Sequence, residues 1–149
     1  MWWRIILKND LVYLVQTNTT VGFLSQNLEK LNEIKKRPPN KKFLKAVNKY
    51  SLLPRTPKKF RKQIRRTPNK HTYVIKNMAY RVITEPIHKE FLQKFKWVYS
   101  SSANESGKNF DREFAIQKAD ILVMDKRGYF ESTPSRIYKV NKFKIRKLR

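Results

Sequence analysis

The stretch WVYSSSANESG, residues 97–107, joins a short apolar strand to a hydroxyl-rich turn that ends at Gly107. A second stretch, LVYLVQTNTTVG at residues 11–22, has the same layout and ends at Gly22. The chain of 149 residues contains only three glycines, so we expect them where the backbone turns sharply or approaches a ligand closely. Two hydroxyl-rich turns that each follow a strand indicate a site for a polar ligand, because ligands of open α/β sheets sit outside strand ends.

A helix is predicted between these two stretches. Leu28, Leu31 and Ile34 recur at helical spacing, and the candidate N-caps are Ser25 and Asn27. The helix must end by residue 37, because the two prolines at 38–39 cannot continue it.

The segment KKRPPNK, residues 35–41, places cations at the end of that helix. Lys35 and Arg37 could neutralise phosphate oxygens, with Lys41 approaching from the next turn, since Arg offers a bidentate fork and Lys a mobile point charge. The alternative is a solvated helix end, the common place for exposed lysines.

The fold class expected from the remaining pattern is a single α/β domain with a mixed sheet, because strands alternate with helices and hairpin-like exceptions occur. Further helices are expected to begin at Thr56-Pro57, at Pro86, and at Asn109 or Asp111. The predicted strands are 11–15, 43–47, 72–76, 79–83, 97–100, 121–124 and 136–140, with a hairpin turn at 77–78. The domain spans residues 11–140, residues 1–10 are a short N-terminal extension or first strand, and residues 141–149 form a basic C-terminal tail.

The formal net charge of +24 indicates a polyanionic partner such as RNA, although a generally lysine-heavy surface would give the same total. Residues 55–70 carry eight basic side chains and no acidic one, and residues 138–149 carry six. Phe60, Tyr138 and Phe143 lie among these charges and could stack on bases, or could pack in the core. The RNA-binding candidates are Lys58, Lys59, Arg61, Lys62, Arg65 and Arg66.

Several classes of enzyme are disfavoured by what the chain lacks. There is no cysteine, and His71 and His88 have no metal-ligand spacing partner. HExxH, GxSxG, GxGxxG and Walker A patterns are all missing, and no residue is assigned as nucleophile, general base or metal ligand. Phosphoryl or nucleotidyl transfer fits the remaining cationic, hydroxyl-rich inventory, because its catalysis is mostly positioning and charge stabilisation. The apolar run at 2–7 is too short to span a bilayer, and we expect a cytoplasmic protein without a membrane partner.

Taken together, these segments resemble the YrdC-like family, the threonylcarbamoyl-AMP synthases. The stretches that carry the resemblance are QTNTTVG at 16–22, KKRPPNK at 35–41, AYRV at 79–82, SSSANESG at 100–107 and TPSRI at 133–137. They occur in the family's order. The chain departs from the family pattern at Gln16, Asn18 and Lys42, and TPNKHT at 67–72 has no glycine where the family has one.

The resemblance implies a twisted mixed sheet with flanking helices around a concave basic cavity. It also implies that L-threonine, bicarbonate and ATP give threonylcarbamoyl-adenylate and pyrophosphate, for N6-threonylcarbamoyladenosine in tRNA. Magnesium would be held through the ATP phosphates, and tRNA, double-stranded RNA and tRNA-modification proteins are the implied partners.

Carried over by position, the resemblance gives each matching residue a role. Thr17 and Arg81 would line the threonine and carbamate side. Lys35, Arg37, Ser102 and Asn104 would bind ATP phosphates, Lys41 would add a phosphate contact, and Ser135 would close the pocket near the nucleotide. The competing hypotheses are a non-catalytic module of the same fold that binds tRNA or double-stranded RNA, and a basic structural protein of the ribosome.

Overall fold

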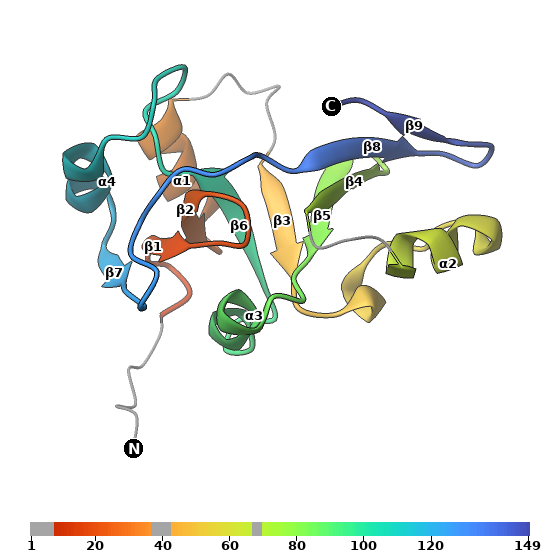
Figure 1. Cartoon of the computed structure of the whole chain (residues 1–149), viewed down its shortest axis with the longest axis horizontal. Coiled ribbons are helices and arrows are strands. Elements are labelled where there is room, and N and C mark those ends of the chain that lie inside the picture. Colours follow the sequence, from red (N-terminus) through yellow and green to blue (C-terminus); the bar gives the residue numbers. More distant parts are fainter. Residues whose placement is uncertain (1–7, 37–42, 67–69) are drawn as a thin grey trace.

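The computed structural model describes residues 8–36, 43–66 and 70–149 and shows one nine-stranded mixed sheet with helices on both faces (Figure 1). The strand order is β7-β1-β2-β6-β3-β5-β4-β8-β9. The strands are β1 (Tyr13–Gln16), β2 (Val21–Ser25), β3 (Leu44–Val47), β4 (His71–Ile75), β5 (Met78–Val82), β6 (Trp97–Ser102), β7 (Ile121–Val123), β8 (Arg136–Val140) and β9 (Ile145–Lys147). The helices are α1 (Leu28–Lys35), α2 (Lys58–Arg66), α3 (Pro86–Leu92) and α4 (Arg112–Lys118), with a short 3-10 turn, η1 (Tyr50–Leu52).

The first half of the sheet contains β7, β1, β2 and β6. Side chains along these strands point alternately to the two faces, so this half has a core on each face. On one face Val12, Leu14 and Phe23 pack with Leu31 of α1 and Ala115 of α4. On the other face, residues of β1, β2, β3 and β6 pack with Leu92 of α3; they include Tyr13, Val15, Leu24, Ala46 and Val98. In Figure 1, α1 and α3 accordingly lie on opposite sides of the central strands.

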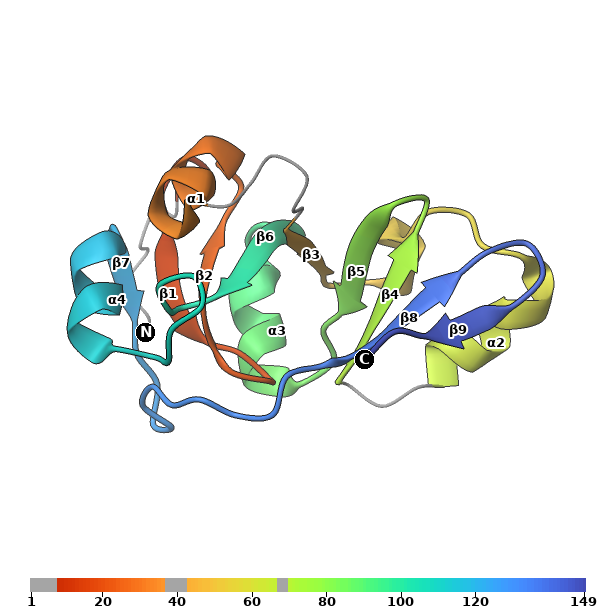
Figure 2. The same cartoon turned by 90° about the horizontal axis from the view of Figure 1, so that it is seen from above.

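The second half of the sheet has its own small core beneath α2. Ile64 of α2 packs with Tyr73, Ile75 and Val140. The partly buried Tyr80 and Tyr138 pack against this cluster. The views in Figures 1 and 2 show α2 at the far end of the molecule from α1 and α4. The first half is therefore covered by helices on both faces and the second half by α2, and β3, β5 and β6 join the halves.

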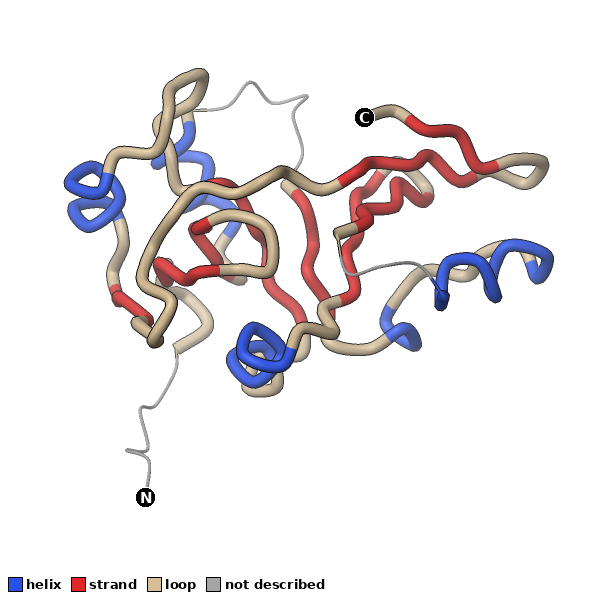
Figure 3. The backbone as a smooth tube through the Cα atoms, in the orientation of Figure 1, coloured by secondary structure: helices blue, strands red, loops and turns tan. Residues whose placement is uncertain are grey.

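A long segment between β7 and β8 crosses in front of the β1–β2 hairpin (Figure 3). The amide of Phe130 donates to Gln16 Oε1 at 2.9 Å, and Phe130 O accepts from the amide of Val21 at 3.1 Å. Arg127 fixes the same segment, because it pairs with Asp125 at 2.7 Å and donates to Gln16 O at 2.9 Å. This crossing carries residues 133–135 from one half of the sheet to the other.

The expected α/β class and mixed sheet are confirmed, and several expected element ends hold. Asn27 caps α1, which ends at Lys35, and Asp111 caps α4. The hairpin turn lies at Lys76 and Asn77 rather than at 77–78, and both residues have the positive φ that a two-residue turn requires.

Three expectations about strands were wrong. Residues 21–25 form β2, although no strand is expected there and the polar turn is expected to end at Gly22. The expected strand at 97–100 continues as β6 to Ser102, through the first serines of the second turn. Residues 141–149, taken as a basic tail, contain β9, which pairs antiparallel with β8. Most of the expected N-terminal extension or first strand, residues 1–7, lies outside the described residues.

Gly22 lies inside β2, opposite Val15 and Ser102, where the backbones of β2 and β6 approach closely. A Cβ atom built at this position would lie 2.9 Å from the carbonyl oxygen of Ser101, a backbone atom that cannot move without disturbing the sheet. A sharp turn or a ligand was expected at Gly22, whereas the close neighbour in the structure is the backbone of another strand. Gly107 and Gly128 instead have φ values of 80° and 71° and lie in turns.

We expect Gly22→Ala to lower the free energy of unfolding by about 1–3 kcal/mol, because the methyl group overpacks a strand pair that cannot separate. Urea unfolding followed by far-UV circular dichroism measures this change. Ser102→Ala, on the neighbouring strand but exposed, is the matched control and should change stability by less than about 0.5 kcal/mol. Equal stability of Gly22→Ala and the wild type would show that β2 and β6 are not tightly packed here.

Candidate functional site

The site is centred on Arg81 of β5, whose side chain is only 8% exposed. Its guanidinium donates to three hydroxyls: Thr19 Oγ1 at 2.8 Å, Thr72 Oγ1 at 3.3 Å and Ser135 Oγ at 3.3 Å. A fourth acceptor, Asn18 Oδ1, lies 3.4 Å from Nη1. Three separate parts of the chain thus converge on one buried cation: the β1–β2 turn, β4 and the segment before β8.

Arg81 forms no ion pair within the described part of the chain, and all its acceptors there are neutral. Burial and, to a smaller extent, the nearby Arg149 together lower the pKa of Arg81 to about 10. The guanidinium therefore remains charged at neutral pH. A buried charge is stabilised by an opposite charge, so this geometry favours an anionic ligand.

A cavity of about 270 Å³ opens beside Arg81. Its walls come from the β1–β2 turn, the end of β6 and the strands β4, β5 and β8. Hydroxyl groups dominate the lining, and its two cations are Arg81 and Arg149. The hydroxyl-bearing lining residues are Thr19, Thr20, Thr72, Ser100, Ser101, Ser102 and Ser135.

Ser135 and Arg149 form the side of the cavity contributed by the end of the chain. Ser135 Oγ lies 2.7 Å from Thr72 Oγ1, which joins it to β4. Arg149 donates to Ser135 O from Nε at 3.1 Å and from Nη2 at 3.0 Å. The residues after β9 therefore hold Ser135 against the cavity and add positive charge.

Lys35 of α1 is 2% exposed and lies against the polar turn that follows β6. Its Nζ donates to Ser102 O at 2.9 Å, to Asn104 O at 2.5 Å and to Asn104 Oδ1 at 3.3 Å. Ser106 Oγ in turn donates to Lys35 O, so helix and turn hold each other. The structure thus brings Lys35, Ser102 and Asn104 together, with the ammonium directed at the turn's carbonyls.

Only some of the other predicted site residues line the cavity. Ser102, Ser135 and Arg81 line the cavity, whereas Thr17 lies behind it: Thr17 Oγ1 donates to Thr20 O at 2.6 Å and accepts from the amide of Thr19 at 3.1 Å. Arg37 and Lys41 lie outside the described residues. The six RNA-binding candidates all lie exposed on α2, and none lines the cavity.

Thr19, Thr72 and Arg149 also lie at the site but are not among the residues predicted from the sequence. Thr19 lies in a motif already singled out, so the hydroxyl pattern could have identified it. Thr72 ends the stretch TPNKHT, but its place beside Arg81 depends on the register of the β4–β5 hairpin, in which Tyr73 pairs with Tyr80. Nothing in the local sequence marks Arg149, which the pairing of β8 with β9 brings to the cavity.

Neither histidine belongs to a candidate metal site: no group of three or more His, Cys, Asp or Glu residues within the described ranges could hold a metal ion. His88 of α3 is buried, and burial lowers its pKa to about 3, with Arg81 and Arg127 adding to the effect. The pKa of His71 is lowered by burial and by Arg136 and Lys147. Nor is any helix in these ranges long and apolar enough to cross a membrane.

The neutral state of His88 predicts a pH dependence of stability. The folded protein keeps the imidazole neutral down to about pH 3, whereas the unfolded chain takes up the proton below about pH 6.5. The free energy of unfolding should therefore fall by on the order of 1 kcal/mol per pH unit as the pH drops from about 6 to about 4.

Urea unfolding of wild type and His88→Gln at several pH values tests this expectation. The variant should be less stable near neutral pH but should lose less stability on acidification than the wild type. His71→Gln controls for the other histidine. An unchanged pH dependence in His88→Gln would contradict the assignment of a neutral buried imidazole.

Comparison with solved structures identifies the fold. The protein is similar to Sua5 from P. abyssi in complex with L-threonine, with a TM-score of 0.75 and 15% identity over 94% of this chain and 50% of that one. YciO from E. coli gives a TM-score of 0.76 and 16% identity over 94% of this chain and 82% of that one. Full-length HypF in its phosphate- and nucleotide-bound form gives 0.74 and 15% identity over 97% and 27% of the two chains. The chain has a YrdC-like fold.

Among curated proteins, the chain is 26% identical over 147 residues to the uncharacterized MG259 homolog of Mycoplasma pneumoniae. It spans about a third of the length of that relative and about half of Sua5. No protein-family model matches the chain.

Proposed function

We propose that this protein is a threonylcarbamoyl-AMP synthase that acts in tRNA modification. The observation that carries the proposal is the buried Arg81 guanidinium, held among neutral hydroxyls beside a cavity, with no carboxylate bound to it within the described chain. The fold supports it, because a structure neighbour, Sua5, is solved with L-threonine and another, HypF, with phosphate and nucleotide.

The proposed reaction has two steps and joins three substrates. The amino group of threonine attacks bicarbonate, and loss of water leaves a carbamate. A carbamate oxygen then attacks the α-phosphorus of ATP, and the bond to the pyrophosphate breaks. Each reactant carries an anionic group, the carboxylate of threonine, bicarbonate and the ATP phosphates, so the protein's main task is to bring negative charges together without a covalent enzyme intermediate.

Arg81 suits the carboxylate or carbamate of the amino-acid part. Its guanidinium is already fixed by Thr19, Thr72 and Ser135, so little conformational entropy is lost when an anion binds. The cavity, at about 270 Å³, is large enough for an amino-acid-sized ligand. Arg149 supplies a second positive charge at its edge.

We assign binding of the ATP phosphates to the turn after β6. Ser102 faces the cavity and Lys35 fixes the turn's carbonyls, so we assign Lys35 and Asn104 to shaping this turn and Ser102 to direct contact with the nucleotide. Arg37 and Lys41 follow α1 directly in the sequence and are proposed to reach the β- and γ-phosphates of ATP, with magnesium bound through those phosphates.

Pyrophosphate release from ATP, measured with and without L-threonine and bicarbonate, tests the proposal. Arg81→Gln should reduce threonine-dependent release by at least about 100-fold, because it removes a preorganised charge from the site. Ser102→Ala should raise the KM for ATP, because it removes a direct contact with the nucleotide. Lys94→Ala, an exposed position after α3, is the control and should behave as the wild type.

Arg81 is also a structural centre, so each variant needs a check on folding by circular dichroism. A folded wild-type protein that releases no threonine-dependent pyrophosphate would contradict the synthase proposal. Full activity in folded Arg81→Gln would contradict the assignment of the anion site.

A further inference from the structure

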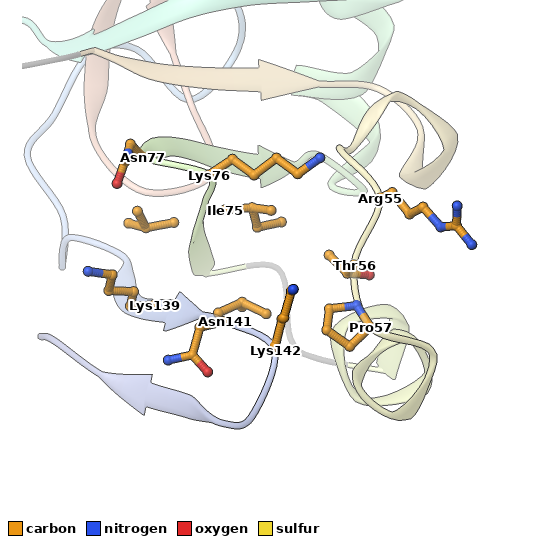
Figure 4. Close-up of a pocket in the computed structure, with 11 residues that line it drawn as sticks. Arg55, Thr56, Pro57, Ile75, Lys76, Asn77, Lys139, Asn141 and Lys142 are labelled. Atoms are coloured by element: carbon orange, nitrogen blue, oxygen red, sulfur yellow. The ribbon is translucent and has the colours of Figure 1, made fainter.

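A second, larger pocket lies away from the Arg81 cavity, between three turns of the sheet's second half (Figure 4). It has a volume of about 510 Å³ and is bounded by the β4–β5 turn, the β8–β9 turn and the segment before α2. The two sites lie at opposite ends of the same strands. Thr72 and Ile137 line the first, whereas Ile75 and Val140 line the second, about 10 Å further along.

The lining of this second pocket combines positive charge with an apolar floor. Its cations are Arg55, Lys76, Lys139 and Lys142, and none of its lining residues is acidic. Within the described chain, none of these four cations takes part in an ion pair. In Figure 4, Lys76 and Lys142 reach over the pocket from two different turns, and Arg55 points outward at its rim.

Local hydrogen bonding shapes the β8–β9 turn. Asn141 Oδ1 accepts from the amides of Phe143 at 2.8 Å and Lys144 at 2.9 Å, which fixes the turn at its tip. Lys59 of α2 donates to Phe143 O at 3.3 Å and so ties the tip to α2. The tip therefore adjoins α2, which carries six exposed basic residues.

Phe143 stands out at this tip, because its side chain is 82% exposed. Of the three aromatic residues that lie among the basic segments, Phe60 and Tyr138 pack into the core beneath α2. Phe143 alone of the three is free to meet a ligand. An exposed ring between Lys142 and Lys144 is the combination that proteins use to stack bases while cations hold the neighbouring phosphates.

We infer that the second pocket, the β8–β9 tip and α2 together bind single-stranded nucleic acid, with backbone phosphates on Lys76, Lys142 and α2 and an unpaired base stacked on Phe143. A single strand fits better than a duplex, because the bases of a duplex are already stacked on each other and cannot cover the Phe143 ring. This inference does not rest on the reaction proposed for the Arg81 cavity.

The first test uses a fluorescein-labelled oligouridylate of about 12 nucleotides and fluorescence anisotropy. Phe143→Ala leaves the charge unchanged and should weaken binding about tenfold, whereas Phe143→Trp should retain it. Met124→Ala, which removes another exposed apolar side chain from a loop in the first half, is the control. Equal affinity of wild type and Phe143→Ala would overturn the stacking contact.

The second test separates this site from the general positive charge. The double variant Lys76→Ala/Lys142→Ala should weaken binding about tenfold and make the salt dependence shallower, with the slope of log K against log salt reduced by about 1. Lys94→Ala/Lys118→Ala removes the same charge from exposed positions near α3 and α4 and is the matched control. Equal losses in both double variants would show non-specific attraction only and would overturn the site.

Competition distinguishes the remaining partners. Unlabelled single-stranded RNA or DNA should displace the probe. The competitor that displaces it at the lower concentration shows whether the site prefers ribose or deoxyribose. A duplex that competes as well as the single strand, or an acidic peptide that does so, would overturn the inference. Arg81→Gln should bind the probe as the wild type does, so this result is independent of pyrophosphate release.

Discussion

The rest of the structure depends on one buried charge that must be surrounded by oxygen atoms. Burying a guanidinium without a carboxylate is unfavourable unless its N–H groups find acceptors. Arg81 finds them in Thr19, Thr72 and Ser135, and each comes from a different segment of the chain. This requirement explains why the β1–β2 turn, β4 and the segment before β8 meet at one place, and why that place suits an anion.

The sheet supplies this meeting point because its two halves are covered differently. Helix α3 covers only part of the face that carries Arg81, and the uncovered part of that face forms the cavity. Lys35 acts from the opposite side of the sheet by holding the turn after β6. The cavity is thus built from backbone that is fixed by buried contacts on both faces, which suits a site that binds by preorganised charge.

Much of the fold could be predicted from sequence, and the failures have a common cause. Asn27, Asp111 and the two prolines after α1 define element ends through local chemistry, which a single segment reveals. β2 and β9 were missed because neither has a distinctive pattern: one contains Gly22, and the other is a short run among basic residues. Their strand state is decided by pairing with β1 and β6 or with β8.

The sequence by itself determined the α/β class and the order of the hydroxyl-rich turns, and its resemblance to the YrdC-like family singled out Arg81, Ser102 and Ser135, which prove to line one cavity. Only the tertiary structure decided that Thr72 and Arg149 join them, that Lys35 lies buried against Asn104, and that Phe143 alone of three candidate aromatics is exposed. The physical reason is the range of the forces involved. Capping and turn chemistry act between near neighbours, whereas burial and strand pairing depend on contacts between residues far apart in the chain.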